Sequence, residues 1–196
     1  MRRSLAASII ACVSVLTVSA AHAQSASSSR VHFTLGAGAM YGNLTGDDFN
    51  GTEAAVGYDA NGGVVLGRWQ LGVGYDRTSY GREDTDGDYI VSNLYFEPRV
   101  VFGAPLRRVV PYAAVRLGRA MATYEGVLGI TDDATGHISG LGAGVLWSVV
   151  SHLQVDAAAH YAWLSHDYDT GGYADAEKGG RPSMRLGVRI DSRRGR

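Results

Sequence analysis

The sequence predicts an all-β fold in which eight antiparallel strands close into an up-and-down transmembrane β-barrel. Eight segments alternate apolar side chains with polar or very small ones, and short connections alternate with long ones. A period of two places successive side chains on opposite faces of a sheet. The chain contains 27 glycines and 4 prolines, and no helical apolar stripe of useful length follows residue 30. These observations favour strands throughout.

The hairpin over residues 56–80 shows the pattern most clearly. The reversal at Gly67-Arg68 is short and contains glycine, as expected of a β-hairpin. The second arm places large apolar side chains on one face, namely Trp69, Leu71, Val73 and Tyr75. Its other face carries polar or tiny residues, namely Gln70, Gly72, Gly74 and Asp76. The rest of the chain repeats this unit.

We expect strands over eight ranges of about ten residues, which is the length that a tilted strand needs to cross a bilayer. These ranges are 31–41, 54–66, 69–80, 89–102, 109–123, 137–147, 153–164 and 184–190. Pro98 lies inside the fourth range and cannot donate a ladder hydrogen bond, so we expect a bulge or an unpaired position there. An even number of antiparallel strands is consistent with a closed barrel.

The connections fall into two classes. Those after the second, fourth and sixth strands are short, at residues 67–68, 103–108 and 148–152. The others are longer and acidic, with Asp47-Asp48, Glu83 to Asp88, Asp132-Asp133, and Asp167 to Glu177. Short turns on one rim and long loops on the other are typical of outer-membrane barrels. Both ends of the barrel domain then lie on the short-turn, periplasmic rim.

The first residues predict a secretory signal peptide over residues 1–23. Arg2-Arg3 precede an apolar run, and Ala21-His22-Ala23 provides a cleavage site. Residues 24–30 read as a flexible lead-in, 31–191 as the barrel, and 192–196 as a basic tail. The single cysteine, Cys12, lies in the signal segment, so no disulfide is expected. The formal charge of -1 becomes -3 without the two arginines, which gives no reason to expect nucleic acid as a partner.

The non-apolar face carries charges in the middle of strands. We expect these residues to project into the barrel and to pair with one another, because an unpaired buried charge is costly. They are Glu97, Arg99, Arg116, Asp156, Arg185 and Arg189. A barrel of eight strands is just wide enough for side chains to fill, so the sequence predicts a plugged polar interior. A narrow gated pore is the alternative for the lumen.

Aromatic residues gather near the strand ends, as in the interfacial girdles of membrane proteins. Trp69, Phe102 and Trp147 lie near the short turns. Tyr41, Tyr75, Tyr161 and Trp163 lie toward the long loops. The apolar faces between them carry almost no charge, Arg119 being the main exception. This arrangement favours a lipid-facing outer wall, whereas a secreted soluble barrel that binds a small ligand is the alternative.

In these patterns the chain resembles the small eight-stranded outer-membrane barrels of the OmpA/OmpX kind. The resemblance rests on the glycine-rich strands at residues 31–39, 71–75 and 140–145. It implies a cell outer membrane location in a Gram-negative-type envelope, contact with outer-membrane lipid and lipopolysaccharide, and a monomer. In one departure from the family pattern, the last strand ends at Ile190-Asp191 rather than on an aromatic residue.

Three further features concern metal binding, catalysis and phosphate contact. Asp84, Asp86 and Asp88 could offer oxygen ligands to Ca²⁺, or form an ordinary acidic loop. His137-Ile138-Ser139 resembles the His-x-Ser pair of outer-membrane lipid A deacylases. Those enzymes continue with Asn and place a Glu about a dozen residues on, whereas here Gly140 follows and no Glu occurs between Ser139 and Glu177. The period of two puts Arg119 on the lipid-facing side of its strand, where it could meet lipopolysaccharide phosphates. A register slip of one residue, or a bulge, would instead turn it inward.

The sequence therefore predicts an outer-membrane β-barrel with a structural or surface-interaction role. We expect no catalytic residues, no cofactor and no bound metal. We also expect the long acidic loops to be extracellular and to bind an extracellular ligand.

Overall fold

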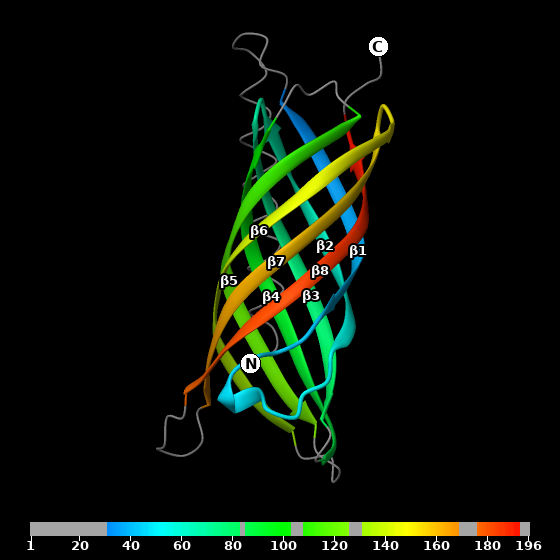
Figure 1. Cartoon of the computed structure of the whole chain (residues 1–196). Helices are drawn as coiled ribbons and strands as arrows, with labels where there is room; N and C mark the ends of the chain where they lie inside the picture. The colour runs from blue at the N-terminus through cyan, green and yellow to red at the C-terminus, as the bar shows by residue number, and fades with distance from the viewer. Residues whose placement is uncertain (1–30, 83–84, 103–107, 126–130, 169–175, 193–196) are drawn as a thin grey trace. The chain divides into compact units, whose positions relative to one another are not determined.

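The computed structural model describes residues 31–82, 85–102, 108–125, 131–168 and 176–192. Eight strands follow one another, with one short 3-10 helix, η2 (Asp47–Phe49), between the first two (Figure 1). The strands are β1 (His32–Gly42), β2 (Ala55–Leu66), β3 (Trp69–Arg82), β4 (Thr85–Val101), β5 (Val109–Glu125), β6 (Thr131–Val150), β7 (Leu153–Tyr168) and β8 (Ala176–Asp191). Among the described residues, no helix is long and apolar enough to cross a membrane.

The strands form a closed antiparallel barrel, which confirms the predicted fold class. Each strand pairs with the next along the chain, and β1 pairs with β8. Closure leaves no sheet edge along the paired length, so the backbone N–H and C=O groups are satisfied between strands. Such closure is what allows β-structure to cross a lipid bilayer.

The stagger between strands fixes the width of the lumen. A row of paired residues that starts at Ala37 on β1 runs across every strand and reaches Lys178 on β8. Ala37 itself pairs with Val188, which lies ten residues further along β8. Eight strands with this stagger tilt by roughly 40° and place the backbone about 8 Å from the axis. An interior of this width is just wide enough for side chains to fill.

The short β2–β3 turn follows the predicted hairpin. Leu66 pairs with Trp69, and Gly67 adopts φ 64°, a left-handed conformation that glycine enters without steric cost. At Pro98 the structure has an unpaired position rather than a bulge. Pro98 pairs with Leu71 on the β3 side, whereas the β4–β5 pairing passes from Phe96 to Arg99 with its register unchanged.

The predicted ends of the later strands were wrong on the long-loop side. β6 begins at Thr131 and β8 at Ala176, several residues before the predicted starts. Asp132 and Asp133, which were expected in a loop, pair with Tyr124 and Thr123 on β5. These parts lack an apolar stripe on the outer face, so the alternation that marked the other strands is absent. Backbone pairing holds them, and the Thr123 hydroxyl donates a side-chain hydrogen bond of 2.9 Å to Asp133.

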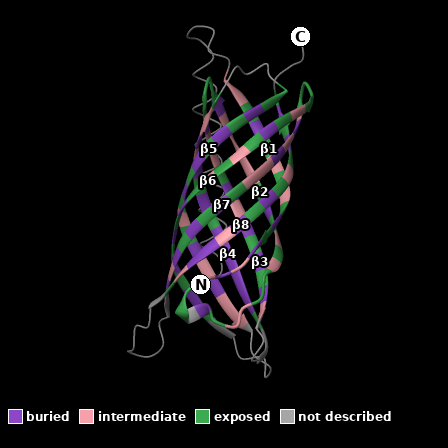
Figure 2. Ribbon diagram, in the orientation of Figure 1, coloured by how far each residue is buried: buried purple, intermediate pink, exposed green. Residues whose placement is uncertain are grey.

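Burial alternates along each strand, with large apolar side chains on the outer wall (Figure 2). Leu35, Val73 and Leu141 are exposed, while charged side chains such as Glu97 and Arg185 are buried. The molecule is therefore apolar outside and charged inside over this part of the wall. That is the reverse of a soluble barrel and the arrangement expected in a bilayer.

The register also gives the height of each residue along the barrel axis. Each residue along a tilted strand rises about 2.5 Å along the barrel axis. Each step from a residue to its paired partner on the next strand shifts the height by about 3 Å along the same axis. On this scale the short-turn aromatics, Trp69, Phe102 and Trp147, lie within about 2 Å of one level. Tyr41, Tyr75, Tyr161 and Trp163 surround a second level about 20 Å away. Tyr58, which is also exposed, adds to this second group.

The outer wall yields a test with a control on the same strand. Ala143 is exposed on β6 midway between the two aromatic levels, and Thr135 is exposed on the same face beyond the long-loop level. We expect Ala143→Arg to lower the free energy of unfolding by about 2–4 kcal/mol, because the guanidinium would meet hydrocarbon. Thr135→Arg should cost about 0–1 kcal/mol. Urea unfolding in lipid vesicles, followed by tryptophan fluorescence, measures both, and equal losses would contradict the assigned band.

Candidate functional site

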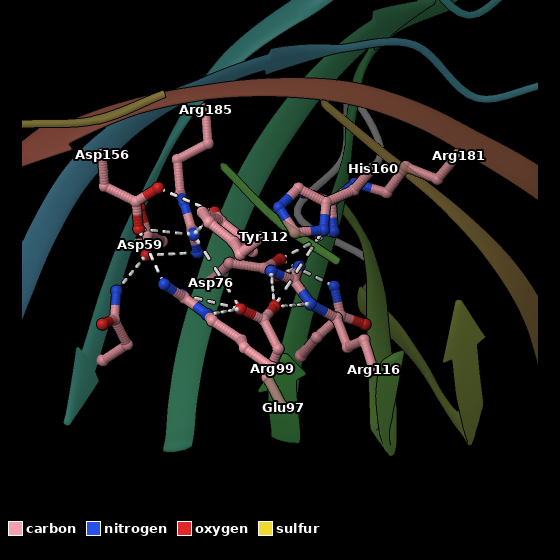
Figure 3. A network of polar contacts seen from close by, with 12 residues as sticks. Asp59, Asp76, Glu97, Arg99, Tyr112, Arg116, Asp156, His160, Arg181 and Arg185 are labelled. Carbon is pink, nitrogen blue, oxygen red and sulfur yellow. Dashed lines mark hydrogen bonds and ion pairs between the residues drawn. The ribbon is translucent and has the colours of Figure 1, made fainter. Parts of the chain in front are cut away.

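Ten charged side chains lie buried inside the described part of the barrel. Five are carboxylates, Asp59, Asp76, Glu97, Asp156 and Asp191, and five are arginines, Arg99, Arg116, Arg181, Arg185 and Arg189. They come from β2, β3, β4, β5, β7 and β8. All except Arg189 and Asp191 meet one another across the lumen (Figure 3). Their formal charges cancel, which removes the cost of a net charge inside a bilayer.

Glu97 on β4 lies at the centre of this charged cluster. Its Oε1 accepts hydrogen bonds from Nε of Arg99, at 2.7 Å, and pairs with Nη2 of the same residue at 2.7 Å. Its Oε2 accepts from Nε and Nη2 of Arg116, at 2.9 and 2.6 Å. Two guanidinium groups thus hold one carboxylate from both sides. Such charge-assisted forked pairs are the strongest hydrogen bonds available to side chains.

Asp156 on β7 extends the cluster toward the short-turn rim. Its Oδ2 accepts from Nη1 of Arg99 and from Nη2 of Arg185, both at 2.9 Å. Its Oδ1 accepts from the hydroxyl of Tyr112 at 2.7 Å. Nη1 of Arg185 also lies 3.5 Å from Oδ2 of Asp59 on the opposite wall.

Asp76 on β3 extends the cluster toward the long-loop rim. Its two oxygens accept from Nη1 of Arg116 at 3.1 Å and from Nη1 of Arg181 at 2.6 Å. Asn93 donates a third hydrogen bond to Asp76 at 2.7 Å. Arg181 in turn donates to the hydroxyls of Tyr80 and Thr78, at 2.9 and 2.8 Å. The contacts therefore run without interruption from Asp156 to Arg181.

Two tyrosine rings pack beneath the arginines. The guanidinium of Arg116 lies 3.8 Å from the ring centre of Tyr95, and that of Arg99 lies 4.8 Å from the ring of Tyr112. These distances are within the range of cation–π attraction. The rings reach across the wall because their neighbours are glycines: a Cβ on Gly144 would lie 2.7 Å from the Tyr112 hydroxyl. Inward glycines therefore make room for the cluster.

Arg189 lies nearer the short-turn rim and has neutral partners. It donates to Oε1 of Gln70 and to Oγ1 of Thr34, both at 2.7 Å. A cavity of about 10 Å³ beside these residues has room for about one water molecule.

An apolar cluster, which we call the apolar cap, lies at the long-loop end of the barrel. It consists of Leu44, Phe49, Tyr80, Tyr89, Val91, Ala120, Ala122, Ala134, Ile138, Ala162 and Leu164. Leu44 and Phe49 come from the β1–β2 segment, and the ring of Phe49 meets that of Tyr89 at 5.7 Å. Thr45 and Gly180 exchange two backbone hydrogen bonds of 2.8 Å, which hold this segment on β8.

The polarity of the barrel reverses between the charged cluster and the apolar cap. By the height scale above, eight of the charged residues lie between the two aromatic levels, Asp191 lies at the short-turn level, and Arg181 lies beyond the long-loop level with the cap. The outer face beyond that level is polar, with Thr135 and Lys178 exposed. Where the outer wall meets water the interior is apolar, and where it meets lipid the interior is charged.

All six predicted interior charges lie inside the barrel and take part in these contacts. Sequence reasoning missed Asp59, Asp76, Arg181 and Asp191. Asp76 had been placed on the polar face of its strand, and Arg181 precedes Arg185 by four residues, so extending the period-two parity would have found it. The seven predicted girdle residues all lie on the outer wall, and six of them are more than 40 % exposed.

The remaining candidates lie elsewhere. Arg119 is exposed on the outer wall between Leu94 and His137, so its lipid-facing parity holds. His137 and Ser139 are also exposed on that wall. Asp84 and the side chain of Asp86 fall outside the described residues, and Asp88 accepts a hydrogen bond from Ser79 at 3.0 Å. Among the described residues no group of three His, Cys, Asp or Glu side chains could hold a metal ion.

A closed barrel with an apolar outer wall, two aromatic levels and a charged lumen defines an outer-membrane β-barrel protein. The family model described as "Outer membrane protein beta-barrel domain" matches residues 8–179, so the chain belongs to that family. The predicted outer-membrane location and the predicted resemblance are thereby confirmed. A sequence comparison with curated proteins finds no match.

Solved structures of the same fold support this assignment. Neisserial surface protein A (NspA) aligns with a TM-score of 0.67 at 17 % identity, over 81 % of this chain and 96 % of its own. Ail of Yersinia pestis, in complex with the heparin analogue sucrose octasulfate, aligns with a TM-score of 0.57 at 17 % identity, over 83 % and 99 %. The N-terminal barrel of Pseudomonas aeruginosa OprF aligns with a TM-score of 0.51 at 15 % identity, over 83 % and 99 %.

The charged cluster predicts a large cost for removing its centre. Glu97→Gln should lower the free energy of unfolding by about 3–5 kcal/mol, because Arg99 and Arg116 would lose their shared buried countercharge. Glu53→Gln, at an exposed position, should change it by less than about 0.5 kcal/mol. Urea unfolding of both variants in the same lipid gives the comparison. A loss below about 1 kcal/mol for Glu97→Gln would show that solvent reaches the cluster.

The apolar cap predicts a local effect. Phe49→Ala should lower the hydrogen-exchange protection of the Thr45 and Gly180 amides about 100-fold, because lost packing of about 3 kcal/mol weakens the docking of the β1–β2 segment. Phe33→Ala, on the lipid-facing wall near the opposite rim, should leave these two amides unchanged. Exchange measured by mass spectrometry or NMR resolves the difference. Unaltered protection in Phe49→Ala would mean that the backbone bridge alone holds the segment.

Proposed function

We propose that this protein is a non-conducting outer-membrane barrel that anchors a rigid extracellular β-structure for contacts at the cell surface. The observation that carries the proposal is the unbroken set of contacts from Asp156 through Glu97 and Asp76 to Arg181. It crosses the lumen between the two aromatic levels, and the apolar cap lies above it.

Energetics favour a plugged lumen over a gated pore. Moving ions through the lumen would require several buried arginine–carboxylate pairs to separate at once. Breaking one such pair costs about 3–5 kcal/mol when the released charge stays buried. The apolar cap would also have to open, because Phe49 and Leu44 cover the same axis. These costs add in one narrow channel, so a resting pore is unfavourable.

The soluble-barrel alternative fits the outer wall poorly. Large side chains such as Trp69, Leu141 and Met184 are at least half exposed on the outside. A soluble carrier needs the reverse, with an apolar interior that receives its ligand and a polar surface. Here the lumen between the aromatic levels holds the charged cluster.

Outer-leaflet lipid is the partner that the outer wall supports best. Arg119 lies just beyond the long-loop aromatic level, at the height where anionic headgroups meet the wall. We infer no catalytic role, since the exposed His137 and Ser139 have no acidic side chain among their described pairing partners.

A plugged barrel should carry no discrete current. Purified protein refolded into planar bilayers is expected to show no stepwise conductance at moderate voltages, because side chains fill the lumen at every level described. The control is a gel-mobility assay on the same preparation, in which a folded barrel migrates differently before and after boiling in SDS. Discrete steps from a preparation that passes this control would overturn the non-conducting role.

A further inference from the structure

Charge is strongly segregated along the barrel axis. Five of the 19 acidic residues are the inward carboxylates of the lumen, and only one of these, Asp191, lies at the short-turn rim, where it is 2 % exposed. All the others belong to the long connections or to the strand ends next to them. The described surface of the short-turn rim therefore exposes no acidic side chain.

The same rim exposes a basic side chain at each of its three turns. Arg68 lies in the β2–β3 turn, Arg108 immediately before β5, and His152 immediately before β7. β1 begins and β8 ends at this rim, and the sequence after Ser192 contains three further arginines. Residues 24–30, 103–107 and 193–196 contain no Asp or Glu. The sequence thus supplies cations to this rim and no acidic residue to neutralise them.

Arg68 and Arg108 are fixed on the rim in the same way. The carbonyl of Arg68 accepts a hydrogen bond of 2.9 Å from the Val101 amide, and the carbonyl of Arg108 accepts one of 2.7 Å from the Ser148 amide. Each arginine backbone is therefore held on the end of the neighbouring strand, while its side chain is exposed. In the part of the chain that the structure describes, neither guanidinium has an ion pair or a side-chain hydrogen bond.

Each of these two arginines lies beside an exposed tryptophan. Arg68 precedes Trp69, and Arg108 precedes Val109, whose pairing partner on β6 is Trp147. The two tryptophans are 55 % and 52 % exposed. On the height scale both arginines lie within about 6 Å of the short-turn aromatic level, on its periplasmic side. Interfacial tryptophans mark the depth of lipid headgroups, so both guanidinium groups can reach headgroup phosphates.

The two arginine–tryptophan pairs face different parts of the surrounding membrane. Trp69 lies on β3 and Trp147 on β6, and β4 and β5 separate them in the barrel wall. A single protein partner would be met by a patch on one side of the rim. Cations spread around the rim at headgroup depth are instead complementary to the lipids that surround a barrel. The distribution of charge therefore favours lipid over a protein ligand.

We propose that Arg68 with Trp69, and Arg108 with Trp147, form two binding sites for anionic glycerophospholipids of the periplasmic leaflet. In each site the guanidinium binds the headgroup phosphate through charge-assisted hydrogen bonds, and the indole packs against the glycerol region. A zwitterionic headgroup brings its own cation next to the phosphate. A site without acidic residues therefore prefers a lipid with a net negative charge. The inference goes beyond the proposed function, which concerns the lumen and the extracellular end.

Brominated lipids test the first site, because bromine on an acyl chain quenches only nearby tryptophans. In a Trp147→Phe/Trp163→Phe background, Trp69 is the one remaining tryptophan. The barrel is refolded into phosphatidylcholine vesicles in which a fixed fraction of brominated lipid is either phosphatidylglycerol or phosphatidylcholine. We expect Trp69 to meet phosphatidylglycerol about threefold to fivefold more often, the size expected of one cation at an anionic lipid surface. Arg68→Gln should abolish this preference. In 1 M NaCl, where the screening length is about 3 Å, it should fall sharply.

The second site gives an independent measurement. In a Trp69→Phe/Trp163→Phe background, Arg108→Gln should abolish the preference of Trp147, whereas Arg68→Gln should leave it unchanged. If one arginine variant fails to insert, the other site decides the question. The matched control is Arg77→Gln, because Arg77 is an exposed cation toward the other end of β3. This variant should leave the preference of Trp69 unchanged.

Four outcomes would overturn the inference. Trp163, alone at the opposite aromatic level, could show the same preference as Trp69, which would mean that anionic lipid gathers around the whole barrel. Arg77→Gln could lower the Trp69 preference as much as Arg68→Gln, which would assign the effect to net charge. Glycerol phosphate in solution could remove the preference at matched ionic strength, which would assign the sites to a soluble anion. The fourth is a barrel that shows the boiling-dependent mobility shift and no lipid preference at either tryptophan. Stepwise conductance would instead defeat the proposed function alone.

Discussion

Closure of eight strands with a ten-residue stagger is the constraint on which the rest of this structure depends. In lipid, every backbone N–H and C=O must find a partner within the protein, and a closed barrel satisfies this requirement. The strand number and stagger then fix the width of the lumen, which is just wide enough for side chains to fill. Whatever side chains point inward must therefore satisfy one another.

The charged cluster answers this demand. Glu97 is held between Arg99 and Arg116, and Asp76 and Asp156 extend the contacts toward the two rims. Equal numbers of buried carboxylates and arginines keep the lumen neutral. Inward glycines such as Gly74 and Gly144 allow Tyr95 and Tyr112 to reach under the guanidinium groups. The high glycine content thus serves packing inside the barrel as well as flexibility in its turns.

The reversal of polarity along the axis connects the fold with its surface role. Between the aromatic levels the wall faces lipid and the lumen is charged, whereas beyond them the strands continue with a polar outer face over the apolar cap. One paired row on β5 to β8, which consists of Arg119, His137, Ser165 and Lys178, lies at the boundary between the lipid-facing wall and the polar outer face. An anionic headgroup is the chemical complement of that boundary.

Much of this arrangement could be predicted, for reasons that differ between residues. Trp69, Leu71 and Val73 revealed their strand because lipid on one side imposes a strict period of two. Asp132 and Ala176 were assigned to loops although they belong to strands. The outer face of these strand ends meets water, so the sequence there does not alternate apolar and polar residues. Glu97 was recognised as an interior charge, but Arg181 was missed because it lies in a stretch with a polar outer face. Phe49 was missed because it belongs to no strand.

The sequence by itself determined the strand count, the inward and outward faces, the aromatic levels and the membrane class, because each depends on local periodicity and on the solvent that a face meets. The tertiary structure alone decided which charges touch, since the partners of Glu97 and Asp76 come from strands that are distant in sequence and are brought together by closure and stagger. It also decided that Phe49 packs against Tyr89 in the apolar cap. Pairings of this kind depend on register around a closed ring, which no local pattern encodes.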